Sequence, residues 1–119
     1  MSESMEFNIV KEELEGITIL KVFGRIDRAV VSEFSNEVKK ALKESNYKLV
    51  IDMGGVIHIN SLGVGVLINS LREARLEGGN LILANLNNTL KRILKIMGLF
   101  RLFVYTNSVE EAVKFFDEK

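Results

Sequence analysis

The sequence contains no cysteine and no proline, and its only histidine is His58. The missing cysteines exclude thiol nucleophiles, cysteine-bound zinc, iron–sulfur clusters and disulfides. One histidine leaves little for a metal site, so we expect neither a metal nor a cofactor. Without proline, the chain must form its turns and helix ends with Gly, Asn, Ser and Asp, which are common at such positions.

The sequence also lacks an excess of charge of either sign, because 16 Lys and Arg residues balance 16 Asp and Glu residues. Nucleic-acid binding depends on concentrated Lys and Arg, so no nucleic-acid partner is expected. No hydrophobic run approaches the ~18 to 20 residues of a membrane span. Residues 1–6 are acidic, whereas a signal peptide begins with a basic segment. These features predict a cytoplasmic protein that does not bind a membrane.

The residues that are present are sufficient for one hydrophobic core. Hydrophobic residues make up 47% of the 119 positions. A chain of this length buries roughly two thirds of its unfolded surface and needs no metal or disulfide to stabilise it. No linker or internal repeat divides the sequence. We therefore expect a single domain over residues 1–119.

The hydrophobic pattern alternates between strand and helix periodicity. Helical spacing predicts amphipathic helices after Asp27, from Ser61 to Glu77, after Asn88 and after Ser108. Gly54 and Gly55 are expected to break the third strand, which would end at Asp52. Alternation after an opening hairpin predicts an α/β fold with a mainly parallel sheet of about five strands and about four helices. The predicted strands are residues 6–11, 17–23, 49–51, 81–84 and 103–105.

Ligands and partners of open α/β sheets bind where the parallel strands end and the next helices begin. Three segments are expected at this edge, namely residues 24–27, Asp52 and residues 59–65. Asp27 is a candidate cap for the first helix, and Asp52 a candidate for an Asx turn into Gly54. The edge is therefore the candidate functional site.

Ser61 has two possible roles at the start of the second long helix. Its hydroxyl suits an N-cap, which accepts a hydrogen bond from a backbone N–H of the first turn. The same hydroxyl suits a phosphate acceptor, because negative charge is stabilised at a helix N-terminus. Gly63 and Gly65 would allow close approach of a partner's backbone. A dinucleotide-binding motif is absent, since Ile68 stands where Gly-x-Gly-x-x-Gly requires its last glycine.

The same helix has two faces. At about 100° per residue, one stripe faces the core and the opposite side carries Leu62, Val66, Asn69 and Glu73. Two apolar residues on an otherwise polar face predict a protein-docking surface, with ordinary exposed apolar residues as the alternative. The stripe expected in the core is Val64, Leu67, Ile68, Leu71 and Ala74.

His58 and a cluster of basic residues are two further candidates for a function. His58 could act as a base for Ser61, but the glycine that precedes the nucleophile in hydrolases is missing, so an enzyme is not expected. Between Glu77 and Glu110 there is no acidic residue. The interval holds a basic cluster that is predicted to be a solvated face, with an acidic partner as the alternative. That cluster is Lys91, Arg92, Lys95 and Arg101.

Several of these segments, in this order, resemble the bacterial anti-sigma factor antagonists of the STAS domain family. They are LVIDMGGV at 49–56, INSLGVGVL at 59–67, GGNLIL at 78–83 and IMGL at 96–99, together with residues 24–27 and 108–112. The resemblance implies a STAS-like fold that acts by binding and not by catalysis. A typical member binds an anti-sigma factor that is also a serine kinase, which frees a sigma factor for transcription. The kinase phosphorylates the antagonist, and a phosphatase reverses the reaction.

The sequence departs from the family pattern at the phosphorylation site. The family usually has Asp-Ser-Ser-Gly or Asp-Ser-Thr-Gly there, with the second hydroxyl phosphorylated. Here Leu62 stands at the acceptor position and Asn60 at the acidic position, while Ser61 matches the first hydroxyl. Ser61 is thus the candidate acceptor, about 100° around the helix from the usual one.

The sequence predicts an anti-sigma factor antagonist with partner-binding residues Asp27, Asn60, Ser61, Leu62, Gly63, Val66 and Asn69. The alternatives are a STAS-like scaffold or subunit of another complex, such as a stressosome or a lipid transport assembly, and a small nucleotide- or phosphate-binding protein.

Overall fold

Strands and helices follow one another in the predicted order. The computed structural model describes residues 6–117, so residues 1–5 of the acidic N-terminal segment and the last two residues lie outside the described part of the predicted domain. The elements are β1 (Asn8–Leu14), β2 (Ile17–Ile26), α1 (Val31–Glu44), β3 (Lys48–Ile59), α2 (Ser61–Leu76), β4 (Asn80–Ala84), α3 (Asn88–Ile96), β5 (Val104–Thr106) and α4 (Val109–Asp117).

The five strands form one mixed sheet in the order β1-β2-β3-β4-β5. β1 and β2 are an antiparallel hairpin, and the other three pairs of neighbours are parallel. This confirms the predicted α/β fold with an N-terminal hairpin. The first strand begins two residues later than predicted and ends at Leu14, and the last strand lies one residue later than predicted.

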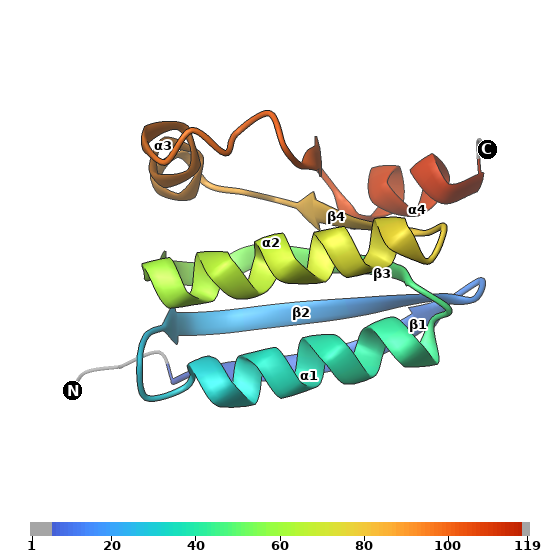
Figure 1. The fold of residues 1–119 in the computed structure, drawn as a ribbon, viewed down its shortest axis with the longest axis horizontal. Helices are drawn as coiled ribbons and strands as arrows, with labels where there is room; N and C mark the ends of the chain where they lie inside the picture. Colours follow the sequence, from blue (N-terminus) through green and yellow to red (C-terminus); the bar gives the residue numbers. More distant parts are fainter. Residues whose placement is uncertain (1–5, 118–119) are drawn as a thin grey trace.

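Helices cover both faces of this sheet. Alternation along β4 directs Leu81 and Leu83 to the face covered by α1, α2 and α3, whereas Ile82 faces Ala112 and Val113 of α4. Figure 1 shows α1 and α2 lying side by side along the sheet. The larger core is therefore on the side of α1 and α2, and α2 brings its first turn to the end of β3.

β3 is much longer than predicted, and Gly54 and Gly55 lie within it. Gly55 pairs with Phe23 of β2, and a side chain at Gly55 would overlap the Phe23 ring. β3 holds one extra residue between its pairs with Lys21 and Phe23, which is a bulge. The prediction that the two glycines end the strand is wrong, because they accommodate a bulge and an aromatic ring.

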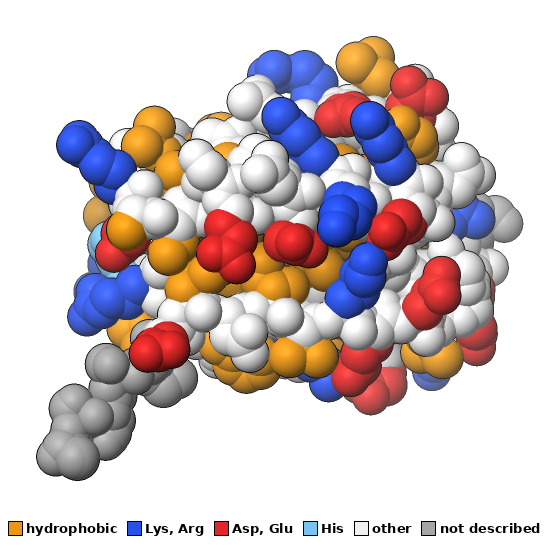
Figure 2. Space-filling model, turned by 90° about the horizontal axis from the view of Figure 1, so that it is seen from below, with side chains coloured by type: hydrophobic (Ala, Val, Ile, Leu, Met, Phe, Trp, Pro, Cys, Tyr) orange, Lys and Arg blue, Asp and Glu red, His pale blue; other side chains and the backbone are white. Residues whose placement is uncertain are grey.

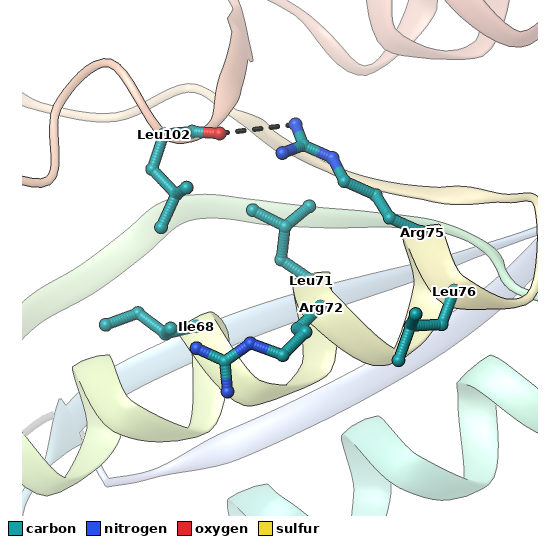
Figure 3. Close-up of a pocket in the computed structure, with 6 residues that line it drawn as sticks. All are labelled: Ile68, Leu71, Arg72, Arg75, Leu76 and Leu102. Carbon is teal, nitrogen blue, oxygen red and sulfur yellow. Dashed lines mark hydrogen bonds between the residues drawn. The ribbon is translucent and has the colours of Figure 1, made fainter.

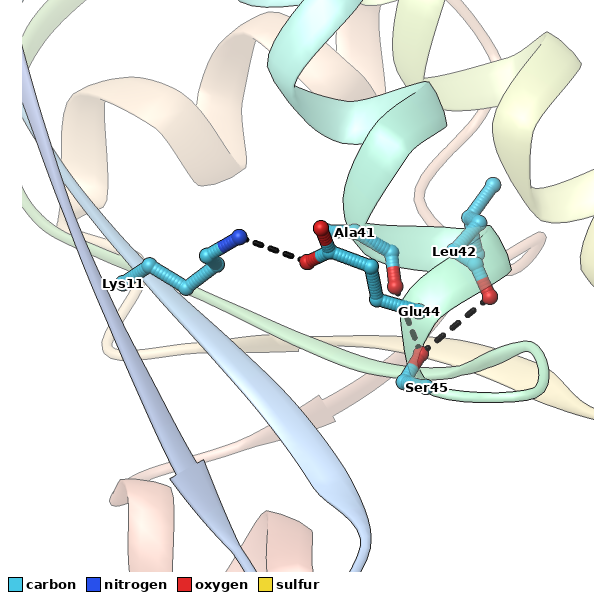
Figure 4. Close-up of polar contacts among 5 residues, drawn as sticks. All are labelled: Lys11, Ala41, Leu42, Glu44 and Ser45. Carbon is cyan, nitrogen blue, oxygen red and sulfur yellow. Dashed lines mark hydrogen bonds and ion pairs between the residues drawn. The ribbon is translucent and has the colours of Figure 1, made fainter.

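Hydrogen bonds and an ion pair fix the far end of α1. The Lys11 ammonium lies 2.5 Å from Glu44 Oε1, which connects β1 to the helix (Figure 4). This hydrogen bond raises the pKa of Lys11. The buried Ser45 hydroxyl donates to the carbonyl of Ala41 at 2.8 Å. On the face seen in Figure 2, hydrophobic side chains run between charged ones where α1 and β1 lie together.

Candidate functional site

The end of β2 and the start of α2 lie side by side. Ile26 and Ile59 are paired residues of the parallel strands β2 and β3. The backbone N–H of Asn60 donates to the carbonyl of Ile26 at 3.0 Å. Asp27 directly follows β2 and Asn60 directly follows β3. The two residues therefore lie at the same edge of the sheet, as predicted.

Asn60, and not Ser61, is the N-cap of α2. The Asn60 backbone is extended, and its side-chain oxygen accepts a hydrogen bond from the N–H of Gly63 at 2.9 Å. Ser61 is the first residue of the helix and is exposed. The capping interpretation of Ser61 is thus wrong, because the preceding residue already satisfies the first-turn donor. The Ser61 hydroxyl is left available at the positive end of the helix.

Asp27 does not cap α1, which corrects a second expectation. The cap position of α1 is Val30, which makes no side-chain capping bond. Asp27 Oδ1 instead accepts from the N–H of Ala29 at 3.0 Å, as in an Asx turn. This turn holds Asp27 exposed in the loop beside the start of α2.

The predicted docking residues of α2 differ in their exposure. Leu62 is 54% exposed, and Asn69 is exposed as well. Val66 is half-buried and packs against the core, so less of it is available than the helical wheel indicates. Gly63 is buried, and a Cβ there would lie 2.7 Å from Ile59 and 2.8 Å from Ile26. Gly63 therefore serves internal packing and does not provide space for a partner, whereas Gly65 has open space around it.

Asp52 lies away from this edge. It is seven positions before Ile59, where β3 ends, and it pairs with Ala84 at the end of β4. Its Oδ1 accepts from the N–H of Gly54 and from the side chain of Asn85, both at 3.0 Å. The predicted bond to Gly54 is present, but Asp52 does not join the site, because β3 continues beyond it.

His58 lies close to Ser61 in sequence, yet the two are not hydrogen bonded to each other in the described chain, residues 6–117. His58 is paired with Arg25 within the sheet. Sequence reasoning missed Ile57, which is 39% exposed near the end of β3. Simple alternation would bury Ile57 together with Ile59, and the second irregularity in the β2–β3 register explains why it does not.

The site contains an exposed hydroxyl and an exposed leucine at a helix N-terminus. The first turn of α2 has no acidic residue, so no carboxylate of its own competes with an added phosphate there. No group of three or more metal-ligating side chains is placed to bind an ion within residues 6–117. The arrangement suits contact with another protein and addition of a phosphate.

A five-stranded mixed sheet with this hairpin and helix arrangement defines a class of small α/β domains. The chain belongs to the STAS domain family, whose model matches residues 8–112. The anti-sigma F factor antagonist of Lysinibacillus sphaericus is 25% identical to it over 92 residues, which are 73% of this chain and 79% of that protein. None of the helices described within residues 6–117 is long and apolar enough to cross a membrane.

Solved structures show the same fold. An anti-sigma factor antagonist from Mycobacterium paratuberculosis superimposes with a TM-score of 0.82 at 20% identity, and 92% of each chain is covered. The anti-sigma factor antagonist SpoIIAA in its unphosphorylated form gives 0.76 at 18% identity, covering 94% of this chain and 98% of SpoIIAA. The phosphorylated form of this Bacillus protein gives 0.68 at 19% identity, covering 92% and 97%.

Proposed function

We propose that this protein is an anti-sigma factor antagonist, which binds an anti-sigma factor and thereby frees a sigma factor for transcription. The observation that carries the proposal is the exposed Leu62 beside the Ser61 hydroxyl at the start of α2. The similar proteins named anti-sigma factor antagonists support it. In this role the protein acts in the cytoplasm by binding, without catalysis.

Leu62 is the apolar anchor of the proposed interface. A leucine that is half exposed in the free protein gains most when a partner buries it in a pocket. Two exposed polar residues belong to the same proposed surface, Asp27 on the neighbouring loop and Asn69 two turns along α2. The buried Gly63 and the capping Asn60 hold this surface in place and make little contact themselves.

Phosphorylation of Ser61 is the proposed switch. A phosphate at this position adds nearly two negative charges next to Leu62, so a closely packed apolar contact would be lost on modification. The helix N-terminus stabilises the added charge within the free protein. The partner is then a serine kinase as well as an anti-sigma factor, and a phosphatase restores the binding form.

The docking surface is tested by titrating the protein with the anti-sigma kinase of the same organism. Leu62→Asp places a charge in the apolar contact and is expected to weaken binding at least about tenfold. Leu76→Gln is the matched control, because Leu76 is an exposed leucine of the same helix, 80% exposed, beyond the proposed surface. Unchanged affinity of Leu62→Asp would show that the surface is assigned wrongly.

The switch is tested separately by incubation with that kinase and ATP, followed by mass spectrometry. Phosphate is expected on the peptide that contains Ser61 and is expected to be absent from Ser61→Ala. Full binding without any phosphate on Ser61 would keep the antagonist function and remove the switch.

A STAS-like scaffold or subunit of another assembly is the second candidate. Leu62 favours it, because a leucine at the usual acceptor position cannot be phosphorylated and leaves a permanent apolar contact. Failure of the anti-sigma kinase to bind, together with binding of another STAS protein that Leu62→Asp removes, would favour this function.

A further inference from the structure

A second apolar surface lies on the other half of α2. It is a groove of about 280 Å³ between the last turns of α2 and the segment that leads into β5 (Figure 3). Its lining residues are Ile68, Leu71, Arg72, Arg75, Leu76 and Leu102. We call it the α2 groove.

Exposed and half-buried apolar side chains line the α2 groove. Leu76 is 80% exposed and Leu102 is 37% exposed. Ile68, which the sequence pattern places in the core, is only half-buried and lines the groove. Exposed apolar side chains that gather around a hollow are typical of a binding site for another molecule.

One wall of the α2 groove is held in place by a hydrogen bond. Nη2 of Arg75 donates to the carbonyl of Leu102 at 3.2 Å, which joins the helix to the opposite segment (Figure 3). The Tyr105 hydroxyl donates to the carbonyl of Phe100 in the same segment, and the two rings are stacked 4.5 Å apart. The groove therefore exists before any partner binds.

The charged side chains that line the α2 groove have one sign. Its two charged lining residues are Arg72 and Arg75, and no carboxylate lines it. A second cavity beyond Leu102 is lined by Lys95 and Arg101 together with Gly98 and Phe100. No acidic residue occurs in the sequence from 78 to 109. A ligand of this region would gain from carboxylates placed beside its apolar contacts.

We propose that the α2 groove binds an acidic amphipathic helix of a partner protein. Residues 68–76 span about 12 Å along the axis of α2, which matches two turns of a docked helix with apolar anchors at positions i, i+4 and i+7. The apolar side of that helix lies on Ile68, Leu76 and Leu102, and its carboxylates pair with Arg72 and Arg75.

The open shape of the α2 groove favours a helix over a small molecule. Small-ligand pockets enclose most of their ligand, whereas Leu76 lies largely in solvent. A helix of a partner protein can cover an open surface of this kind, because its side chains contact the groove along its whole length. Arg72 and Arg75 suit the carboxylates of such a partner, since guanidinium groups pair with carboxylates in a planar fork.

The α2 groove is separate from the surface at the start of α2. Leu62 and Leu76 are fourteen residues apart, which is about 21 Å along the helix. The two surfaces can therefore be tested by separate substitutions. The proposal does not depend on the antagonist function, and either can fail while the other holds.

The probe for this proposal is a synthetic amphipathic peptide of about four helical turns, with leucines on one face and glutamates beside them. Methyl NMR spectra of the whole protein are expected to shift at Ile68, Leu71, Leu76 and Leu102. Leu76→Gln and Arg72→Glu are each expected to weaken binding about tenfold. Leu62→Gln is the matched control and is expected to leave the affinity unchanged.

A second peptide replaces every glutamate with lysine and keeps the leucines, and it is expected to bind at least about tenfold more weakly. Equal binding of the two peptides, or shifts confined to the start of α2, would overturn the proposal. So would shifts at the groove produced by decanoate but not by the peptide, which would indicate a small amphiphile. Shifts that grow with protein concentration alone would indicate self-association and would overturn it as well.

Discussion

Leu62 and Leu76 are exposed leucines of the same helix, but they lie in opposite chemical surroundings. Leu62 follows an asparagine cap and a serine at the N-terminal, positive end of α2. Leu76 lies at the other end of α2, beside Arg72 and Arg75. A phosphate added near Leu62 is stabilised by the helix, whereas carboxylates near Leu76 must come from a partner.

This comparison shows how one helix can present two separate binding surfaces. Its buried stripe, which includes Val64, Leu67 and Leu71, fixes it on the sheet over its whole length. The two ends then differ by the polarity of the helix and by their neighbours, the loop after β2 at one end and the segment before β5 at the other.

The largest effect is expected from filling the space at Gly63. Gly63→Val would place methyl groups against Ile59 and Ile26, and overpacking of this kind costs about 3 kcal/mol. The free energy of unfolding, measured by chemical denaturation, is the readout. Gly65→Ala is the control, because no atom lies near the new Cβ, and it should raise stability by up to about 1 kcal/mol. Equal effects of the two changes would contradict the packing described at the start of α2.

A smaller loss is expected from Asn60→Ala, which removes the cap bond to the N–H of Gly63. The expected cost is about 1 kcal/mol in the free energy of unfolding. Asn69→Ala changes an exposed asparagine of the same helix, whose side-chain oxygen accepts a long hydrogen bond from Arg72 at 3.4 Å. That control should stay within about 0.5 kcal/mol of the original protein. If Ser61→Ala proved more costly than Asn60→Ala, Ser61 would be the cap after all.

The polarity of α2 predicts opposite signs for the same new charge at its two ends. Ser61→Glu introduces the first carboxylate of the first turn and should stabilise the protein by about 0.3 to 1 kcal/mol. Leu76→Glu places the charge at the negative end, where Arg72 one turn earlier offsets part of the dipole effect, so it should destabilise the protein by about 0.5 kcal/mol or less. Ser61→Gln and Leu76→Gln are the uncharged controls. Both differences should shrink in high salt, and like signs at the two ends would show that the helix dipole does not govern them.

The smallest effect concerns the segment that carries Leu102 and depends on pH. Burial raises the pKa of Tyr105 to about 12, against about 10 in the unfolded chain. Because the folded pKa is the higher one, stability is fully retained below pH 10 and is lost as the pH rises towards 12. Tyr105→Phe should not lose this part of its stability when the free energy of unfolding is measured from pH 10 to pH 12. Parallel curves for the two proteins would show that Tyr105 ionises without cost.

Much of the fold follows from the pattern of apolar residues. The order of strands and helices, the hairpin and the stripe over Val64, Leu67 and Leu71 were predictable, because burial requires periods of two and 3.6 residues. The end of α2 was predictable too, since Gly78 adopts the left-handed backbone with φ +87° that favours glycine.

The predictions that the structure contradicts concern residues whose role depends on a neighbour distant in the sequence. Gly54 and Gly55 have the local composition of a turn, yet Phe23 from another strand covers Gly55 and keeps β3 extended. Asn60 and Ser61 are both good caps by residue type. Only the hydrogen bond from Asn60 N–H to the Ile26 carbonyl decides which of them precedes the first helical turn.

The sequence by itself determined the family, the alternation of strands and helices, and the serine and leucine at the start of α2, because these depend on residue types and their spacing. Only the tertiary structure decided that Gly63 is buried, that Ile68 lines a groove, and that Leu102 lies opposite Arg75. The physical reason is that exposure depends on which distant segments pack together, and here Arg75 of α2 and Leu102 of the segment before β5, 27 residues apart in the chain, lie side by side.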